Sequence, residues 1–296
     1  MKPPVFAYHA PESLDAALAL LSGQPNARVL AGGQSLLPML NFRLVAPDHL
    51  VDIARIPNLA GIRVDDEGGD IVFGAMTRQR EIEFSGLVAR HLPLMAEAIR
   101  QVGHRQTRNR GTLGGSLCHL DPAAELPVVA MALDAVLTAA STRGRRTIPM
   151  AAFPDGMMTP SLEPDEMLVE IRCTPWPDGH GWAFEEFARR HGDFAIVAVA
   201  CLLATGADGR VSRAAVTLGG VLSTPTRITA AEQVLIGAMP DEATLDVAAR
   251  HCGDVDALED VHAPAWYRQQ VAVTLAGRAL RRAVARLGTV ASGGGR

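Results

Sequence analysis

The chain has 296 residues, of which 48% are hydrophobic and 20% are charged, and its formal net charge is −4. This length predicts about two domains that each bury a core, and the slightly acidic balance argues against a nucleic-acid partner. Residues 1–5 hold no apolar signal core, and the longest apolar run, 195–204, is about half as long as the ~20 residues of a membrane helix, so we expect a cytoplasmic chain without a membrane span.

The first predicted elements are a helix, a strand and a glycine loop. Residues 13–21 have apolar side chains at helical spacing, and residues 28–31 form a short strand that leads into Gly32-Gly33. Ser35 is placed to cap the turn that follows, and Pro38 falls in a first helical turn, where proline is tolerated.

The next predicted elements are two strands and a helix. The strands lie at 49–53 and 69–74, with turn residues at 64–69 between them. The helix runs from Leu92 to Val102 and precedes the basic segment 104–110.

Two structures fit the segment that follows residue 120. Asp121-Pro122 favours a short turn, and Pro127 favours the start of a helix that continues through Met131 and Leu133. One kinked helix and a turn followed by a helix both agree with this pattern.

A domain boundary is predicted between Ile171 and Trp182, because residues 173–181 are rich in proline and glycine and lack periodicity. Beyond it, residues 194–204 and 210–218 predict two antiparallel strands joined by a turn. Helices are then predicted at 230–236, 242–251 and 266–287, and the last nine or so residues predict a disordered tail.

Two double-glycine segments, 31–35 and 112–116, are the most informative feature of the chain. Glycine permits positive φ and close approach of backbone N–H groups to a bound group, and successive N–H groups at a helix start bind anions. Both segments carry Ser or Thr beside the glycines and lie in one predicted domain, so together they are able to hold a pyrophosphate, which points to a dinucleotide cofactor. Gly219-Gly220 has a similar pattern at a strand end, and there we expect no ligand.

Several other site types lack their motif. The Rossmann and Walker glycine patterns are absent, which disfavours classical NAD or ATP binding. No Ser-His-Asp or paired-carboxylate arrangement is present, so no catalytic residue is assigned. The spacing of Cys118, Cys173, Cys201 and Cys252 fits neither a metal pair nor an iron–sulfur ligand set, so we expect reduced structural cysteines and no metal site.

Two charged segments have more than one interpretation. The first is a basic segment with three alternative roles: it neutralises a phosphate, forms a subunit surface or lies solvated. Its basic residues are Arg105, Arg108 and Arg110. Residues 189–194 are either a polar turn before an apolar strand or a loop that places an aromatic ring and charges against a cofactor ring.

Four segments together resemble the FAD-binding medium subunits of molybdenum hydroxylases, a family that includes carbon monoxide dehydrogenase medium subunits and the flavin domain of xanthine dehydrogenase. The segments are 31–38 (AGGQSLLP), 109–116 (NRGTLGGS), 121–125 (DPAAE) and 190–195 (RHGDFA). The resemblance extends from Phe6 to about Leu287.

The resemblance implies an α+β protein. Residues 1–176 would be a PCMH-type FAD-binding domain, of the vanillyl-alcohol-oxidase type, made of two α/β subdomains. Residues 177–288 would be a C-terminal domain with a small antiparallel sheet and helices, and residues 289–296 a disordered tail.

The resemblance also implies which residues hold a non-covalent FAD. In this family the two double-glycine segments hold the pyrophosphate, Glu125 bonds the ribose or nearby polar atoms, Leu168 contacts the adenine end, and Asp193 and Phe194 lie near the isoalloxazine. The implied cofactor-binding residues are Val29, Leu30, Ala31, Gly32, Gly33, Gln34, Ser35, Leu36, Val102, Gly103, Thr112, Gly114, Gly115, Ser116, Glu125, Leu168, Asp193 and Phe194.

Two positions depart from known branches of the family. Xanthine dehydrogenases carry a lysine where this chain has Glu185, which weakens an NAD-reducing interpretation. Carbon monoxide dehydrogenases usually carry histidine where Gln34 stands, which disfavours carbon monoxide as the substrate.

The implied function is that of an oxidoreductase subunit that transfers electrons. Its partners would be an iron–sulfur small subunit with [2Fe-2S] clusters and a molybdopterin-binding large subunit, assembled as a dimer of heterotrimers, and the FAD would pass electrons to an external acceptor. Two alternatives remain open: a standalone FAD-dependent oxidase or reductase, and a non-enzymatic nucleotide-binding scaffold subunit.

Overall fold

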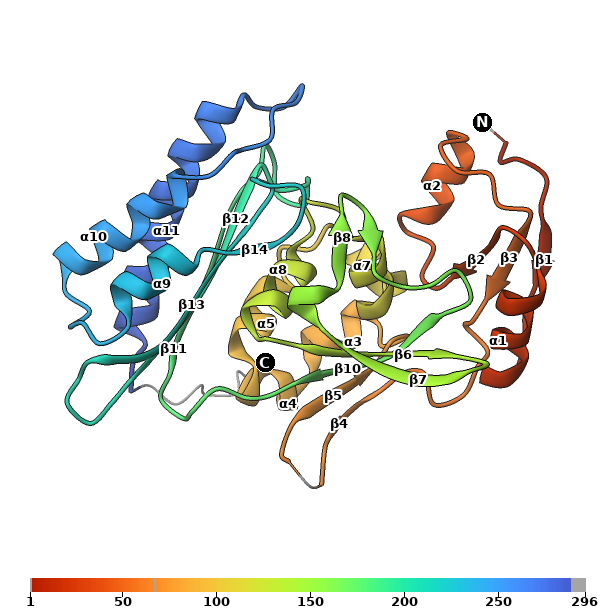
Figure 1. Ribbon diagram of the computed structural model, residues 1–296, viewed down its shortest axis with the longest axis horizontal. Helices are drawn as coiled ribbons and strands as arrows, with labels where there is room; N and C mark the ends of the chain where they lie inside the picture. The colour runs from red at the N-terminus through yellow and green to blue at the C-terminus, as the bar shows by residue number, and fades with distance from the viewer. Residues whose placement is uncertain (1, 67, 289–296) are drawn as a thin grey trace.

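The computed structural model describes residues 2–66 and 68–288. The tail expected at 289–296 lies outside the described residues. Along the chain, the described residues form an N-terminal unit, a central unit and a C-terminal unit, which lie side by side from right to left in Figure 1.

The N-terminal unit is a small parallel sheet with two helices. Its strands are β1 (Ala7–His9), β2 (Ala27–Leu30) and β3 (His49–Asp52), in the order β1-β3-β2. Helix α1 (Leu14–Gly23) begins at Ser13, whose hydroxyl accepts a hydrogen bond from the Ala16 N–H at 3.2 Å. Helix α2 (Leu36–Asn41) follows the first double glycine at the carboxyl end of β2. The predicted helix and strands of this unit are confirmed within one or two residues at each end.

The central unit is an antiparallel sheet of five strands in the order β4-β5-β10-β6-β7. The strands are β4 (Ile62–Val64), β5 (Ile71–Gly74), β6 (Val136–Ser141), β7 (Gly144–Pro149) and β10 (Met167–Cys173). A short 3-10 helix, η1 (Met150–Ala152), precedes the small hairpin of β8 (Pro154–Gly156) and β9 (Thr159–Pro160).

Six short helices belong to this unit, and all of them except α6 contribute residues to one apolar core with the sheet. They are α3 (Gln79–Phe84), α4 (Gly86–His91), α5 (Pro93–Ala98), α6 (Arg105–Arg110), α7 (Leu113–His119) and α8 (Glu125–Ala132). Helix α8 is buried along its whole length, so it forms the centre of the molecule (Figure 1).

The structure corrects two predictions in this region and decides between two alternatives. The helix expected at 92–102 is shorter, because α5 ends at Ala98 and the chain then turns at Gly103, where φ is 47°. The basic segment is helix α6, and the second double glycine is the first turn of α7 rather than a loop. Residues 121–124 form a turn before α8, so the turn followed by a helix is the correct alternative.

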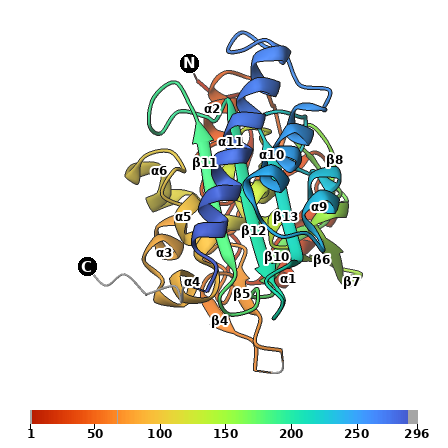
Figure 2. The same cartoon turned by 90° about the vertical axis from the view of Figure 1, so that its left-hand side faces the viewer.

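The C-terminal unit is an antiparallel sheet in the order β11-β12-β13-β14, with its helices on one face (Figure 2). Its strands are β11 (Gly181–Phe187), β12 (Val197–Thr205), β13 (Val211–Gly219) and β14 (Thr226–Arg227). Its helices are α9 (Thr229–Leu235), α10 (Glu242–Arg250), η2 (His251–Gly253) and α11 (Ala265–Ala285). The strand expected from residue 194 begins only at Val197, and β11 was not among the predicted strands.

The other face of this sheet packs on the central unit. Phe184 and Ala198 belong to the same apolar core as α5 and α8, whereas their neighbours Ala183 and Val199 belong to the core under α11. Alternate residues of each strand therefore face the two sides. Glu97 of α5 accepts hydrogen bonds from the guanidinium groups of Arg282, at 2.6 Å, and Arg286, at 2.5 Å. The two units thus share a continuous apolar core reinforced by ion pairs.

Candidate cofactor site

The two double-glycine segments lie directly against each other. A Cβ added to Gly32 would lie 2.3 Å from the carbonyl oxygen of Arg110 and 2.9 Å from the Cα of Gly111. A Cβ added to Gly115 would lie 3.7 Å from the Cβ of Ala31. The N-terminal and central units therefore meet at these glycines, as the hypothesis of one two-sided site requires.

The first segment presents a row of free main-chain donors. Among the residues that the structure describes, no acceptor is present for the backbone N–H groups of 32–36. Gly33 has a φ of 72°, which favours glycine, and the side-chain amide of Gln34 donates to the Gly32 carbonyl at 3.2 Å. Ser35 stands at the N-cap of α2, but its hydroxyl makes no capping bond. These donors and the Ser35 hydroxyl are therefore left for a bound group.

The second segment uses the backbone donors of residues 113–116 within the protein. The N–H of Leu113 donates to Thr77, that of Gly114 to Ala75 at 2.9 Å, and that of Gly115 to the Thr112 hydroxyl at 3.0 Å. Of the backbone donors of this segment, the Thr112 N–H is the one for which no acceptor is present among the described residues, because the helix start is otherwise capped internally. The Ser116 hydroxyl also has no hydrogen-bond partner among these residues, so both donors are left for a bound group.

Glycine at position 114 has a packing reason. A Cβ there would lie 2.7 Å from both the Cβ and the carbonyl oxygen of Ala75. The Ala75 N–H in turn donates to the carbonyl of Val169 in β10 at 3.0 Å. Leu168, which precedes Val169 in β10, is buried in the apolar core and pairs with Ala139 of β6, so its side chain is occupied there.

A second cluster forms where α5 ends and α6 begins. The guanidinium of Arg108 is buried and donates to the carbonyls of Val102, at 2.9 Å, and Gly103, at 3.2 Å. Its Nε donates to the Glu83 carboxylate, also at 2.9 Å. Burial opposes ionisation of Glu83, but the hydrogen bonds from Arg108 and Arg80 outweigh it and lower the pKa of this carboxyl. Arg108 thereby fixes the 102–103 turn.

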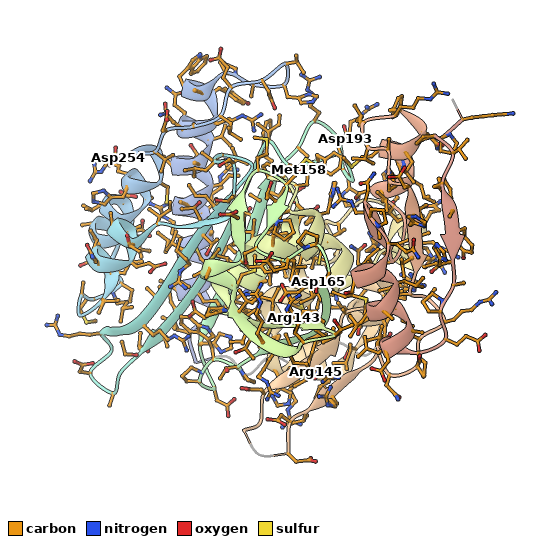
Figure 3. The ribbon with its side chains drawn as sticks, turned by 45° about the vertical axis from the view of Figure 1, so that its right-hand side comes forward. Arg143, Arg145, Met158, Asp165, Asp193 and Asp254 are labelled. Atoms are coloured by element: carbon orange, nitrogen blue, oxygen red, sulfur yellow. The ribbon has the colours of Figure 1, made fainter. Side chains whose placement is uncertain are left out.

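The turn at 189–194 packs against the same 102–104 segment. A Cβ added to Gly192, whose φ is 86°, would lie 2.4 Å from the His104 ring and 3.2 Å from the Gly103 carbonyl. Asp193 accepts a hydrogen bond from Arg190 at 3.2 Å, and Phe194 is 69% exposed. Figure 3 shows Asp193 at the edge of the molecule, on the loop that leaves β11. The structure thus brings the expected 102–103 and 193–194 pairs together.

Glu125 lies nearby as the first residue of α8 and is only 6% exposed. The turn before it is fixed to the C-terminal sheet, because the Pro122 carbonyl accepts a hydrogen bond from the Gly220 N–H at 2.7 Å. Burial raises the pKa of Glu125 to about 7. Gly220 has a φ of 72° and its added Cβ would meet the Ile196 carbonyl at 2.6 Å, which explains the third double glycine by packing.

One residue of this region was missed by the sequence analysis. Glu186 of β11 is close enough to Glu125 for the two charges to interact, and burial together with that charge raises the pKa of Glu186 to about 8. Its Oε2 atom is buried without a hydrogen-bond partner. The signal was a carboxylate on the same strand face as the buried Phe184, and it becomes visible only once β11 is recognised.

The comparisons with known proteins decide the family. Residues 4–176 match the FAD binding domain in molybdopterin dehydrogenase, and residues 182–283 match the CO dehydrogenase flavoprotein C-terminal domain. The chain belongs to the family of FAD-binding subunits of molybdopterin dehydrogenases. The expected fold, cofactor and oxidoreductase class are therefore confirmed.

Two relatives and two solved structures show how far the likeness extends. The 6-hydroxypseudooxynicotine dehydrogenase complex subunit alpha of Paenarthrobacter nicotinovorans is 43% identical, covering 97% of each chain. The carbon monoxide dehydrogenase medium chain of Hydrogenophaga pseudoflava is 39% identical, covering 97% of this chain and 99% of that one. A structure of carbon monoxide dehydrogenase from the same organism matches with a TM-score of 0.93 at 39% identity, covering 97% and 100%. Quinoline 2-oxidoreductase from Pseudomonas putida 86 matches with a TM-score of 0.90 at 36% identity, covering 96% and 99%.

The residues of the first segment fit the FAD of this family. FAD carries a negatively charged pyrophosphate, and a row of N–H groups without protein acceptors is suited to its oxygens. Gly32 has no room for a Cβ, so a ligand is able to approach its main chain without a side chain in between.

Two further features concern metals and membranes. Among the described residues, no group of three or more His, Cys, Asp or Glu side chains is arranged to hold a metal ion. Within the same residues, no helix combines the length and apolar character needed to cross a membrane. The four cysteines are free thiols, and three of them are buried.

Proposed function

We propose that this chain is the FAD-carrying electron-transfer subunit of a molybdenum hydroxylase complex. The observation that carries the proposal is the run of unpaired N–H groups at 32–36, which faces the second double-glycine segment across the Gly32–Arg110 contact. Membership of the family supports the same conclusion.

The proposed binding residues follow from this geometry. The N–H groups of 32–36 and the Ser116 hydroxyl hold the pyrophosphate, while residues 29–31 at the end of β2 and just after it form the floor of the site. The main chain of Leu168 contacts the adenine end. Thr112, Gly114 and Gly115 act by packing, because they set the distance between the two segments.

The other end of the site would hold the flavin ring. We assign this end to the 102–103 turn, Glu125 and the 193–194 pair, which the contacts of Gly192 and Arg108 bring together. When bound, FAD supplies a centre that accepts electrons singly and donates them in pairs. The protein residues bind and orient that centre, and the exposed Phe194 ring stands where the site opens to solvent.

The division of the chain follows the same proposal. Residues 1–176 carry the non-covalent FAD in two subdomains, and residues 177–288 form the C-terminal domain, which closes the flavin end through β11 and its loop. The extents of the two matched families support this division.

The proposed partners are an iron–sulfur small subunit with [2Fe-2S] clusters and a molybdopterin-binding large subunit, in a cytoplasmic dimer of heterotrimers. Two relatives, the nicotine 6-hydroxylase medium subunit and the caffeine dehydrogenase subunit beta, are 39% and 40% identical to this chain although their names state different substrates. This supports the proposal that the large subunit chooses the substrate.

Purification of the tagged chain from its native host tests the assembly. We expect two further polypeptides, with molybdenum and iron, in constant ratio to FAD. A chain that is purified alone with FAD and is bleached directly by a substrate would contradict the proposal in favour of a standalone enzyme. A colourless chain that binds adenine nucleotides would favour a scaffold.

A further inference from the structure

The carboxyl groups of Glu125, which is buried, and of Glu186, which is half-buried, interact electrostatically between the central and C-terminal units. Glu125 is more than nine-tenths buried, and among the described residues its side chain has no partner other than its own main-chain N–H. The Oε2 atom of Glu186 is buried and unpaired. A buried polar atom without a partner costs free energy, so the Oε2 atom of Glu186 indicates a ligand at this place.

The register of the sheet explains why they meet. Glu186 of β11 pairs with Ala198 of β12, and Ala198 pairs with Gly219 of β13. Gly219 leaves no room for a Cβ, because one would lie 2.3 Å from a methyl of Val128 in α8. These small residues allow α8 to lie close on the sheet, which places its first residue, Glu125, near Glu186.

The charges around the pair do not neutralise it. Arg108 of α6 lowers and Asp121 raises the pKa of Glu125, but the guanidinium of Arg108 is committed to Glu83 and to two carbonyls. Glu97 of α5 is paired with Arg282 and Arg286. Glu185, the neighbour in β11, bonds Arg282 on the opposite face of the sheet, and β12 contributes only Ala198 opposite Glu186.

We propose that Glu186 is an additional FAD-binding residue, which in its neutral form donates a hydrogen bond to the cofactor from its buried carboxyl. The proposal rests on the proposed function, because it places the flavin end of FAD between the 102–103 turn and β11. A protonated carboxyl is a donor, whereas a carboxylate only accepts. Binding of FAD is therefore linked to one proton.

The linkage has a defined direction. With a pKa of about 8, Glu186 is largely neutral at pH 6.5 and largely ionised at pH 9. If only the neutral form binds FAD well, the Kd should rise by about tenfold between these pH values, in proportion to the lost competent fraction. Calorimetry at pH 8.5 in two buffers should also show an uptake of about 0.8 proton per FAD bound.

Three variants of the full chain test the assignment, with the Kd for FAD measured by flavin fluorescence. Glu186→Gln keeps a donor and cannot titrate, so its Kd should stay close to the wild-type value at pH 6.5 and change less than about twofold up to pH 9. Glu125→Gln should move the rise in Kd to lower pH, because it removes the charge that raises the pKa of Glu186. Glu185→Gln is the matched control on the opposite face and should keep the wild-type pH profile.

The outcomes separate this inference from the proposed function. Failure of the wild-type chain to bind FAD at pH 6.5 would overturn both. Binding without proton uptake, or a Glu186→Gln variant with the full wild-type pH profile, would overturn this inference alone. The proton uptake of the wild-type chain tests whether FAD binding is linked to a proton, and it does so even if a variant does not fold.

Discussion

Gly32 packs against the main-chain carbonyl of Arg110 so closely that an added Cβ would lie 2.3 Å from that oxygen. This contact joins the end of β2 to the end of α6, and so the N-terminal unit to the central unit. It also places the free N–H groups of 32–36 opposite the second double glycine.

Replacing Gly32 with alanine should separate the two segments. The new Cβ collides with main-chain atoms that have no flexible end to move, and such overpacking costs about 1–3 kcal/mol. We expect FAD affinity to fall by about tenfold or more, since 1.4 kcal/mol corresponds to a factor of ten. Gly23→Ala is the matched control, because a Cβ there meets nothing within 4 Å. Equal FAD affinity for both variants, measured by fluorescence titration, would refute the role of this contact.

Replacing Arg108 with methionine should loosen the 102–103 turn. The change leaves Glu83 without its main partner and two carbonyls without their donor, and breaking a buried ion pair costs about 3–5 kcal/mol. Urea unfolding should show this loss, and FAD affinity should fall as well. Arg105→Met, at an exposed position of the same helix, should change neither. A similar effect of the two variants would argue that α6 acts only as a charged surface.

Replacing Glu97 with alanine should weaken the joint between α5 and the C-terminal unit. Glu97 bonds Arg282, Arg286 and the Phe184 N–H, so its removal is expected to lower the free energy of unfolding by about 2 kcal/mol. Glu242→Ala removes an exposed partner of Arg281 and should cost at most about 1 kcal/mol. Equal losses in urea unfolding would show that the buried joint contributes no more than a surface ion pair.

The stability of the chain should also decline in acid through Glu166. Hydrogen bonds from Arg146 lower the pKa of this carboxyl below 4.5. A carboxyl whose folded-state pKa is lowered contributes stability at pH values above its unfolded pKa, and this contribution is lost as the pH falls through the folded value. The midpoint temperature of thermal unfolding should therefore fall less steeply between pH 6 and pH 3 in Glu166→Gln than in the wild type. Glu163→Gln, in the same turn but exposed, should follow the wild-type curve.

The sequence predicts those elements that have a strong local signal. Strands β2 and β3 and the long helix α11 follow from periodicity and glycine, whereas the sequence left the turn before α8 undecided against one kinked helix. Helix α6 has no such signal, because its residues are almost all polar and its position depends on Arg108 reaching Glu83, which lies outside its own sequence segment. The strand β11 is set by pairing with β12 over its whole length.

The sequence proposes residues for the site but does not predict their hydrogen bonds. The pattern Thr112-Leu113-Gly114-Gly115 is equally compatible with free donors and with donors bonded inside the protein. The donors are bonded inside the protein because Thr77 and Ala75, which are distant in the chain, lie close to this segment and accept from it. The sequence alone does not predict a role for Glu186, because its approach to Glu125 depends on small residues of two neighbouring strands.

The most direct test of the account is the visible absorption spectrum of the chain purified alone, followed by mass analysis of the compound that heat releases. We predict flavin bands and intact FAD, close to one per chain, with weak binding in Gly32→Ala. A colourless protein that takes up no added FAD, although it is folded by circular dichroism, would contradict the assignment of the site.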